Sequence, residues 1–337
     1  MKIQALYLLA VSTAFVTALL VTPQVRKLAL KVGVLDHVDE RRMHADPKPR
    51  IGGIAVYLGL AFALFVSIGF GLHTTLFHSA NDTKDFFGLL FGSTLIMLVG
   101  VWDDIMGMSP RNKFLAQIVV ALVSMVYGFH IPGFEIPGTE RYVNLPGWID
   151  YPITLVWYLG MMNAINFLDG LDGLLAGVTA ISGVSLFAIA SAHGHVGAAL
   201  VLMALVGGAL GFLPFNFNPA KIILGDTGSL FIGYVFATVS LLVTAKIAVT
   251  VSLLVPLVAL ALPVVDTAAA IFRRVRAGKA ITEADRGHFH HVLVFHFGLN
   301  VKQAVLLIYA VSILLGAAAY FLSGSGTPAH AHLARLM

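Results

Sequence analysis

The sequence contains no cysteine and very few charged residues. Of its 337 residues, 58% are hydrophobic and only 11% are Asp, Glu, Lys or Arg. The missing cysteine excludes disulfides, thiolate nucleophiles and cysteine metal sites. The shortage of charge excludes a soluble globular protein of this length, and the mean hydropathy of +0.89 indicates an integral membrane protein. Any chemistry must therefore use carboxylates, amides, histidines and lysines.

The apolar residues form runs of about 17 to 25 residues, the length of a helix that crosses roughly 30 Å of hydrocarbon. This pattern predicts an all-α polytopic membrane protein and excludes a β-barrel, whose strands are about 10 residues long. The first run is expected to be a retained helix, because no small-residue cleavage site precedes Arg26 and Lys27. We expect one domain over residues 1–337 with ten spans, at 4–22, 51–71, 86–102, 113–130, 151–168, 174–192, 197–213, 229–245, 248–271 and 302–322.

The distribution of Lys and Arg predicts the orientation, because positive charge is retained in the cytoplasm. Sixteen of the 21 Lys and Arg residues lie in the loops at 23–50, 103–113, 214–228 and 272–302. These loops are therefore expected to be cytoplasmic, with both termini and a short hairpin or loop at 131–150 outside. Because the basic residues are confined to loops between apolar spans, the net charge of +4 indicates a lipid bilayer as partner and no nucleic acid.

Polar side chains gather beside four spans on the predicted cytoplasmic side. Ionisable groups next to apolar spans are costly, so their positions usually report function. The four groups are Asp103 and Asp104 in WDDIMG, Asn163, Asn166, Asp169 and Asp172 in NAINFLDGLDGL, Asp226 in LGDTGS, and Asp285, Arg286, His288, His290 and His291 in DRGHFHH. The topology is predicted from Lys and Arg counts alone, yet all four polar groups fall on its cytoplasmic side. This agreement between charge counts and polar groups predicts one composite active site at the cytoplasmic face.

Several carboxylates become compatible in one site when a hard divalent cation lies among them. Magnesium takes a few protein oxygens plus substrate phosphates, and the glycines beside these acids permit close approach of a diphosphate. Lys113, Arg286 and the histidines offer cationic groups for phosphate oxygens. The pattern is thus typical of phosphate chemistry.

A purely structural role is also open for each of these groups. Asp103 and Asp104 are placed to cap a helix that begins near Pro110, and Asp226 is placed to cap the span that begins beside it. The DGLDG string is consistent with a turn, and HFHH with an amphipathic surface. A secondary transporter or ion channel is the alternative from a different class. Transporter sites lie near the bilayer midplane on broken helices, whereas these acids lie at span ends.

Together these motifs resemble the polyprenyl-phosphate N-acetylhexosamine-1-phosphate transferase family, whose bacterial members include WecA, TagO and MraY. The resemblance runs from RMHADPKPRIGG at 42–53 to DRGHFHH at 285–291, with five motifs in the family's order. PVVDTAAAIFRRVRAGK followed by DRGHFHH resembles the branch of WecA and TagO. MraY-like chains carry three adjacent histidines, whereas Phe289 interrupts them here. This departure favours UDP-GlcNAc over UDP-MurNAc-pentapeptide as donor.

The resemblance also implies roles for individual residues. Asp103, Asp104 and Asp226 are the implied catalytic acids, with Asp226 and Asn166 at the magnesium and diphosphate positions. Mn²⁺ is a plausible substitute for Mg²⁺. The implied substrate-binding residues are His44, Arg50, Lys113, Asn166, Asp169, Asp172, Arg286, His288, His290 and His291. Lys113 corresponds to a lysine that contacts the lipid phosphate, and Asp169 and Asp172 to acids that line the nucleotide cleft.

The implied reaction transfers GlcNAc-1-phosphate from UDP-GlcNAc to undecaprenyl phosphate, giving polyprenyl diphosphate-GlcNAc and UMP. Such a step initiates cell-envelope polysaccharides of the O-antigen, enterobacterial common antigen or teichoic acid type, at the bacterial inner membrane. Another UDP-N-acetylhexosamine and UDP-MurNAc-pentapeptide are the alternative donors. A homodimer remains open, as does the choice between direct attack and a covalent intermediate.

Overall fold

A computed structural model describes residues 3–36, 47–72, 80–135, 142–244, 260–276 and 289–323, and almost all of them are helical. The helices are α1 (Ile3–Val32), α2 (Gly53–Ser67) with the π-helical turn η1 (Ile68–Leu72), α4 (Ala80–Met106), α5 (Pro110–Val126), α6 (Gly147–Leu168), α7 (Leu174–Ala192), α8 (Val196–Asn216), α9 (Gly225–Thr244), α11 (Ala261–Arg276), α12 (Phe289–Phe295) and α13 (Val301–Leu322). Two short hairpins pair β1 (Leu35–Asp36) with β2 (Lys48–Pro49) and β3 (Gly133–Glu135) with β4 (Tyr142–Asn144).

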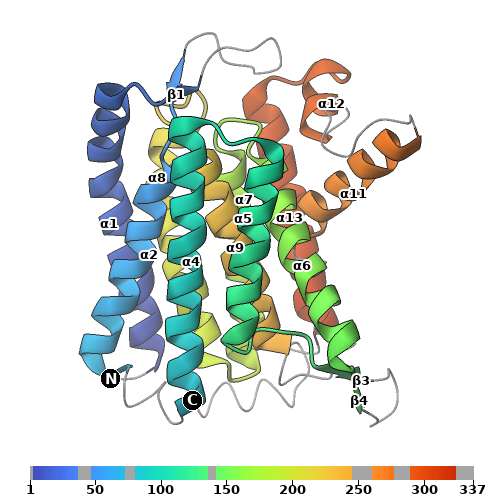
Figure 1. Ribbon diagram of the computed structural model, residues 1–337. Helices are drawn as coiled ribbons and strands as arrows, with labels where there is room; N and C mark the ends of the chain where they lie inside the picture. Colours follow the sequence, from blue (N-terminus) through green and yellow to red (C-terminus); the bar gives the residue numbers. More distant parts are fainter. Residues whose placement is uncertain are drawn as a thin grey trace.

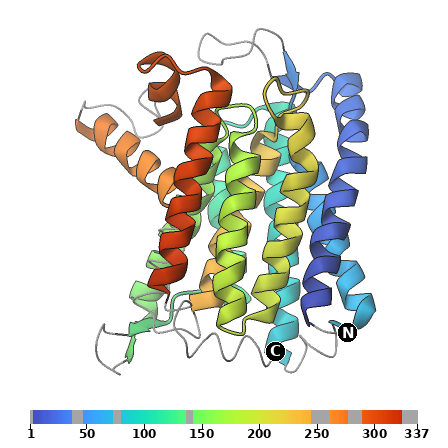
Figure 2. The ribbon, with the colours of Figure 1, turned by 180° about the vertical axis from the view of Figure 1, so that it is seen from behind.

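The long helices form an antiparallel bundle with α9 at its centre (Figures 1 and 2). α9 packs against α2, α4, α6 and α8, and its apolar residues from Leu230 to Val239 are buried. A helix that is buried on all sides belongs to the interior of a bundle. Its first turn therefore lies where several helix ends meet.

Within the described part of the chain, seven helices are long and apolar enough to cross a membrane: α1, Gly53–Phe70, Lys84–Met106, α7, α8, Gly225–Val243 and α13. They coincide with seven of the ten predicted spans, which confirms a multi-pass membrane protein. α5 and α6 are helices where spans were predicted, but they are not among these seven. α5 has only 17 residues, and α6 carries several polar side chains. Much of the predicted span 248–271 lies outside the described residues, and its described part belongs to α11, which runs on to Arg276.

Figure 1 shows which chain segments lie at each end of the bundle. The start of α1, the end of α13 and the β3–β4 hairpin lie at one end, and the starts of α5 and α9 lie at the other (Figure 1). The predicted hairpin at 131–150 is confirmed, with Gly133 paired to Asn144. Which end faces the cytoplasm stays a prediction from the Lys and Arg counts, as does the single domain over residues 1–337.

Two glycines bring neighbouring helices into backbone contact with the first turn of α9. A Cβ on Gly53 of α2 would lie 2.1 Å from the Gly228 nitrogen, and one on Gly100 of α4 would lie 2.5 Å from the Asp226 carbonyl oxygen. Neither position has room for a methyl group. The start of α9 is therefore fixed against α2 and α4 by the main chain itself.

The segment that precedes α2 pairs with the loop between α8 and α9. The Ile223 N–H donates to the Pro49 carbonyl at 2.9 Å, and the Gly52 N–H donates to the Ile223 carbonyl at 2.9 Å. The Gly53 N–H continues the pairing with the Leu224 carbonyl, also at 2.9 Å. This pairing carries Arg50 to the beginning of α9.

Candidate active site

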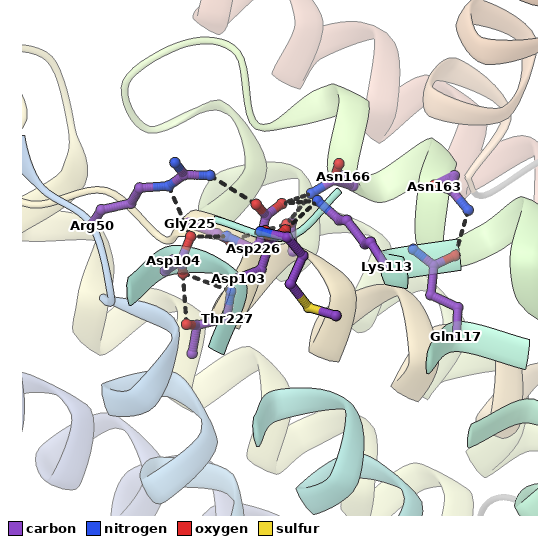
Figure 3. Close-up of polar contacts among 12 residues, drawn as sticks. Arg50, Asp103, Asp104, Lys113, Gln117, Asn163, Asn166, Gly225, Asp226 and Thr227 are labelled. Carbon is purple, nitrogen blue, oxygen red and sulfur yellow. Dashed lines mark hydrogen bonds and ion pairs between the residues drawn. The ribbon is translucent and has the colours of Figure 1, made fainter. Parts of the chain in front are cut away.

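Asp226, in the first turn of α9, lies at the centre of a cluster of charged groups (Figure 3). Lys113 Nζ lies 2.7 Å from its Oδ1, and Arg50 Nη2 lies 2.7 Å from its Oδ2. The Asn166 amide donates to the same Oδ1. Its side chain is 10% exposed, so the carboxylate is nearly buried between two cations and an amide. Buried charges need such partners.

Arg50 joins two of the acids that the motifs singled out. Its Nε lies 2.8 Å from Asp104 Oδ1, while its Nη2 contacts Asp226, and its Nη1 lies 3.7 Å from Asp36 Oδ1. The planar guanidinium presents donors in several fixed directions, which a lysine does not. Burial by itself lowers the pKa of Arg50, but the nearby acids outweigh it and raise the pKa above its ordinary value. Arg50 therefore stays charged.

Asp103 lies at the end of α4 and faces the beginning of α5. Its Oδ2 lies 2.9 Å from Lys113 Nζ, and its Oδ1 accepts the Met108 N–H at 2.7 Å. Lys113 thus bridges Asp103 and Asp226, which places the two carboxylates on either side of one ammonium group. A site with this layout can bind a phosphate at the lysine and present a carboxylate beside it.

Asp104 caps α9. Its carboxylate accepts the Asp226 N–H at 3.0 Å, the Thr227 N–H at 2.9 Å and the Thr227 hydroxyl at 2.6 Å, in addition to its contact with Arg50. A carboxylate at a helix N-terminus satisfies backbone donors and interacts favourably with the helix dipole. The sequence leaves open that Asp103 and Asp104 cap the helix beginning near Pro110, which is α5. Asp104 is indeed a helix cap, but it caps α9, and Ser109 caps α5.

Asp169 follows the last residue of α6 and lies near the same cluster. Burial, together with the carboxylates of Asp226 and Asp104, raises the pKa of Asp169 to about 7, and Arg50 offsets only part of this effect. Asp169 therefore titrates near neutral pH. A cation bound nearby would favour its ionised form.

Asp172 is buried in a set of hydrogen bonds between loops. It accepts from Lys48 Nζ at 2.8 and 3.0 Å, from the Asn218 amide at 3.1 Å and from the Ala220 N–H at 2.9 Å. Its side chain is 1% exposed, so it contributes little to any cleft wall. The structure thus places Asp172 between the DGLDG turn, β2 and the α8–α9 loop, where it holds these segments together.

Comparison with known proteins identifies the family to which this chain belongs. The model of "Glycosyl transferase family 4" matches residues 86–244, which include most of α4, the helices α5 to α9 and the members of the cluster around Asp226 other than Arg50. The chain is 36% identical over 93% of its length to the "Probable undecaprenyl-phosphate N-acetylglucosaminyl 1-phosphate transferase" of Bacillus subtilis, covering 84% of that protein. This chain belongs to glycosyl transferase family 4.

Two further relatives show the breadth of glycosyl transferase family 4. The "Decaprenyl-phosphate N-acetylglucosaminephosphotransferase" of Mycolicibacterium smegmatis is 33% identical over 88% of this chain and 77% of its own length. The "Phospho-N-acetylmuramoyl-pentapeptide-transferase" of Staphylococcus saprophyticus is 28% identical over 92% of this chain and 97% of its own length. The order of identities fits the predicted branch of WecA and TagO.

Several residues that the family resemblance implied lie beyond this geometry. His44, Arg286 and His288 are outside the described residues, and of His290 and His291 only the backbone, in α12, is described. α12 lies at the same end of the bundle as the start of α9 (Figure 1). The structure therefore brings together Arg50, Asp103, Asp104, Lys113, Asn166 and Asp226, with Asp169 close by.

Four residues in and around the cluster were not singled out as site residues from the sequence. Lys48 pairs with Asp172, Asp36 lies near Arg50, Thr227 completes the contacts of Asp104, and Gln117 hydrogen-bonds Asn163. Lys48 and Thr227 lie within the motifs RMHADPKPRIGG and LGDTGS, so their positions could have identified them as candidates. Nothing in the sequence around Asp36 or Gln117 distinguishes them from ordinary polar residues.

The cluster fits a magnesium ion that is bound chiefly through its substrate. Among the described residues no group of three His, Asp or Glu side chains is arranged to hold a metal. Magnesium usually takes only one or two carboxylates, with the other positions filled by water and phosphate oxygens. The Asn166 nitrogen donates to Asp226 and Ser229, so its carbonyl oxygen is directed elsewhere. Asp226 and Asn166 would each offer one oxygen to such an ion.

Proposed function

We propose that this protein transfers GlcNAc-1-phosphate from UDP-GlcNAc to a polyprenyl phosphate at the cytoplasmic face of the bacterial inner membrane. The observation that carries the proposal is the placement of Asp226 between Lys113 and Arg50 at the start of α9. Two cations and a carboxylate at one helix end suit two phosphorylated substrates. The relatives' names, which specify N-acetylglucosamine and a polyprenyl phosphate, supply the substrate class.

In the proposed reaction, an oxygen of the lipid phosphate attacks the β-phosphorus of UDP-GlcNAc. A bond forms between that oxygen and the β-phosphorus, while the bond to the bridging oxygen breaks and its electron pair leaves with UMP. Direct attack is favoured over a covalent aspartyl-phosphate, because a polyprenyl phosphate is already a competent nucleophile at neutral pH. Positioning and charge stabilisation then provide most of the catalysis, as in other phosphoryl transfers.

Each charged residue has a task in this scheme. Asp226 and Asn166 would hold Mg²⁺ (or Mn²⁺), which neutralises charge on the diphosphate and the leaving group when bound. Lys113 binds the lipid phosphate beside Asp103, and Arg50 exchanges part of its contact with Asp226 for a phosphate oxygen. Asp103 orients the acceptor phosphate and takes its proton when it has one.

Asp104 supports the cluster and does not touch a reacting group in this proposal. Both its oxygens accept from α9 and one also pairs with Arg50, so they are committed to shaping the site. UDP-GlcNAc is favoured over UDP-MurNAc-pentapeptide because the relatives named for N-acetylglucosamine are 36% and 33% identical, compared with 28% for the N-acetylmuramoyl-pentapeptide transferase. The product would then start a cell-envelope polysaccharide.

The test is UMP release by purified protein in detergent. We expect UMP from UDP-GlcNAc only when both a polyprenyl phosphate and Mg²⁺ are supplied, and loss of release with a chelator. Competing UDP-GalNAc and UDP-MurNAc-pentapeptide against UDP-GlcNAc identifies the donor. Absence of UMP with every donor and metal, from protein shown to be folded, would contradict the proposal.

A further inference from the structure

Gln117 and Asn163 form a partly buried polar contact between α5 and α6, beside the charged cluster (Figure 3). The Asn163 Nδ2 donates to Gln117 Oε1 at 2.7 Å and to the Leu159 carbonyl at 2.8 Å. Gln117 is only 1% exposed, and Asn163 is half-buried. An amide pair at such a place costs desolvation that an apolar pair would avoid, so its presence calls for a reason.

The hydrogen-bond partners fix the orientation of both amides. A backbone carbonyl only accepts, so the nitrogen of Asn163 must face Leu159. The same nitrogen reaches Gln117, which must therefore present its oxygen. If the Gln117 amide were reversed, two N–H donors would face each other. If the Asn163 amide were reversed, its oxygen would face two other acceptor oxygens. The contact thus has a single register, unlike an apolar contact that tolerates small sliding of one helix along another.

This contact lies one helical turn from the charged cluster on both helices. Gln117 follows Lys113 by four residues on α5, and Asn163 precedes Asn166 by three on α6, so each pair shares a helix face. Lys113 and Asn166 both reach Oδ1 of Asp226. Two successive contacts therefore connect α5 and α6: the amide pair directly, and the next turn through Asp226.

We propose that the hydrogen bond between Gln117 and Asn163 is a positioning contact that sets the register of α5 against α6, so that Lys113 and Asn166 meet at one oxygen of Asp226. The inference rests on the proposed function for its effect on turnover. Gln117 and Asn163 act through Lys113 and Asn166 and touch no substrate. An ångström of misplacement at such a site lowers turnover by up to about a hundredfold.

The first experiment measures kcat for Gln117→Met, which keeps the length of the side chain and removes the amide acceptor. We expect kcat to fall about tenfold. In a Lys113→Met background the same substitution should change kcat less than about twofold, because the residue it positions is gone. Equal losses in both backgrounds would overturn the proposal. Asn163→Leu, which removes the donor, should match Gln117→Met, and the double variant should be no worse than either single variant.

The second experiment measures the arrangement of the helices without using turnover. The cysteine-free chain accepts a pair of spin labels at Val119→Cys on α5 and Val156→Cys on α6, both exposed positions. We expect Gln117→Met to broaden or shift the distance distribution between the labels. An unchanged distribution would overturn the proposal. Because this measurement needs no substrate, it separates a failure of the positioning contact from a failure of the proposed reaction.

Ser124→Ala is the matched control. Ser124 is also buried on α5, two turns beyond Gln117, and its hydroxyl pairs with the Tyr234 hydroxyl at 2.8 Å, far along the helix from Lys113. Its loss should lower thermal stability to an extent similar to Gln117→Met but leave kcat within about twofold of wild type. If Ser124→Ala lowers kcat as much as Gln117→Met, general weakening of the bundle accounts for both and the proposal is wrong.

Discussion

Asp103 and Asp104 are neighbours in the chain, yet their carboxylates contact different helices. Asp103 lies 2.9 Å from Lys113 Nζ on α5, whereas Asp104 accepts three hydrogen bonds from the first turn of α9. Consecutive side chains on a helix point about 100° apart, so the end of α4 reaches two partners at once. The pair thereby connects the ammonium of Lys113 to the helix that carries Asp226.

The first prediction concerns Asp103. We expect Asp103→Asn to lower kcat with little change in the KM for UDP-GlcNAc, because an interaction that acts mainly in the transition state is lost. The defect should shrink as pH rises, since more of the lipid phosphate is then already a dianion. A pH-rate profile parallel to that of the wild type would show that Asp103 binds or positions and does not accept the proton.

Asp104 should affect stability more than its neighbour does. Asp104→Asn removes the charge that faces the α9 N-terminus and Arg50, and loss of a helix cap alone costs about 1 kcal/mol. We expect a lower midpoint of thermal unfolding in detergent for Asp104→Asn than for Asp103→Asn. Equal midpoints for the two variants would mean that the cap contributes nothing measurable.

Asp226 should dominate the metal dependence of the reaction. Asp226→Asn preserves size but removes the charge, and we expect kcat to fall by at least about a hundredfold with a higher Mg²⁺ requirement. Magnesium titrations of wild type and variant provide the measurement. Near-normal turnover with an unchanged magnesium requirement would locate the metal at other residues.

The orientation of the bundle can be tested with two matched asparagines. Asn112 is exposed at the start of α5, and Asn144 is exposed in the hairpin at the opposite end. In the cysteine-free chain we expect an impermeant thiol reagent to label Asn144→Cys on intact cells and Asn112→Cys only after permeabilisation. The reverse result would place the charged cluster outside, away from cytoplasmic nucleotide sugars.

The apolar runs predicted most of the helices, and the positions of acids at span ends predicted that Asp103, Asp104 and Asp169 lie near Asp226, whereas Arg50 was named only through the family resemblance. Both succeed because hydrophobic length and the cost of buried charge act locally. The partners of Asp172 were not predictable in this way, since Lys48 lies 124 residues earlier and pairs with it only through the folded arrangement of loops. The same holds for Asp104, whose hydrogen bonds span 122 and 123 residues.

The contacts of Gly53 and Gly100 with the first turn of α9 have a consequence for mutational scans of this protein. Adding a methyl group at Gly100 would press on the backbone of Asp226 and shift its carboxylate while leaving every charged side chain intact. Loss of activity would then map to positions that carry no functional group. A survey restricted to acids, bases and amides would overlook residues whose contribution is the absence of a side chain.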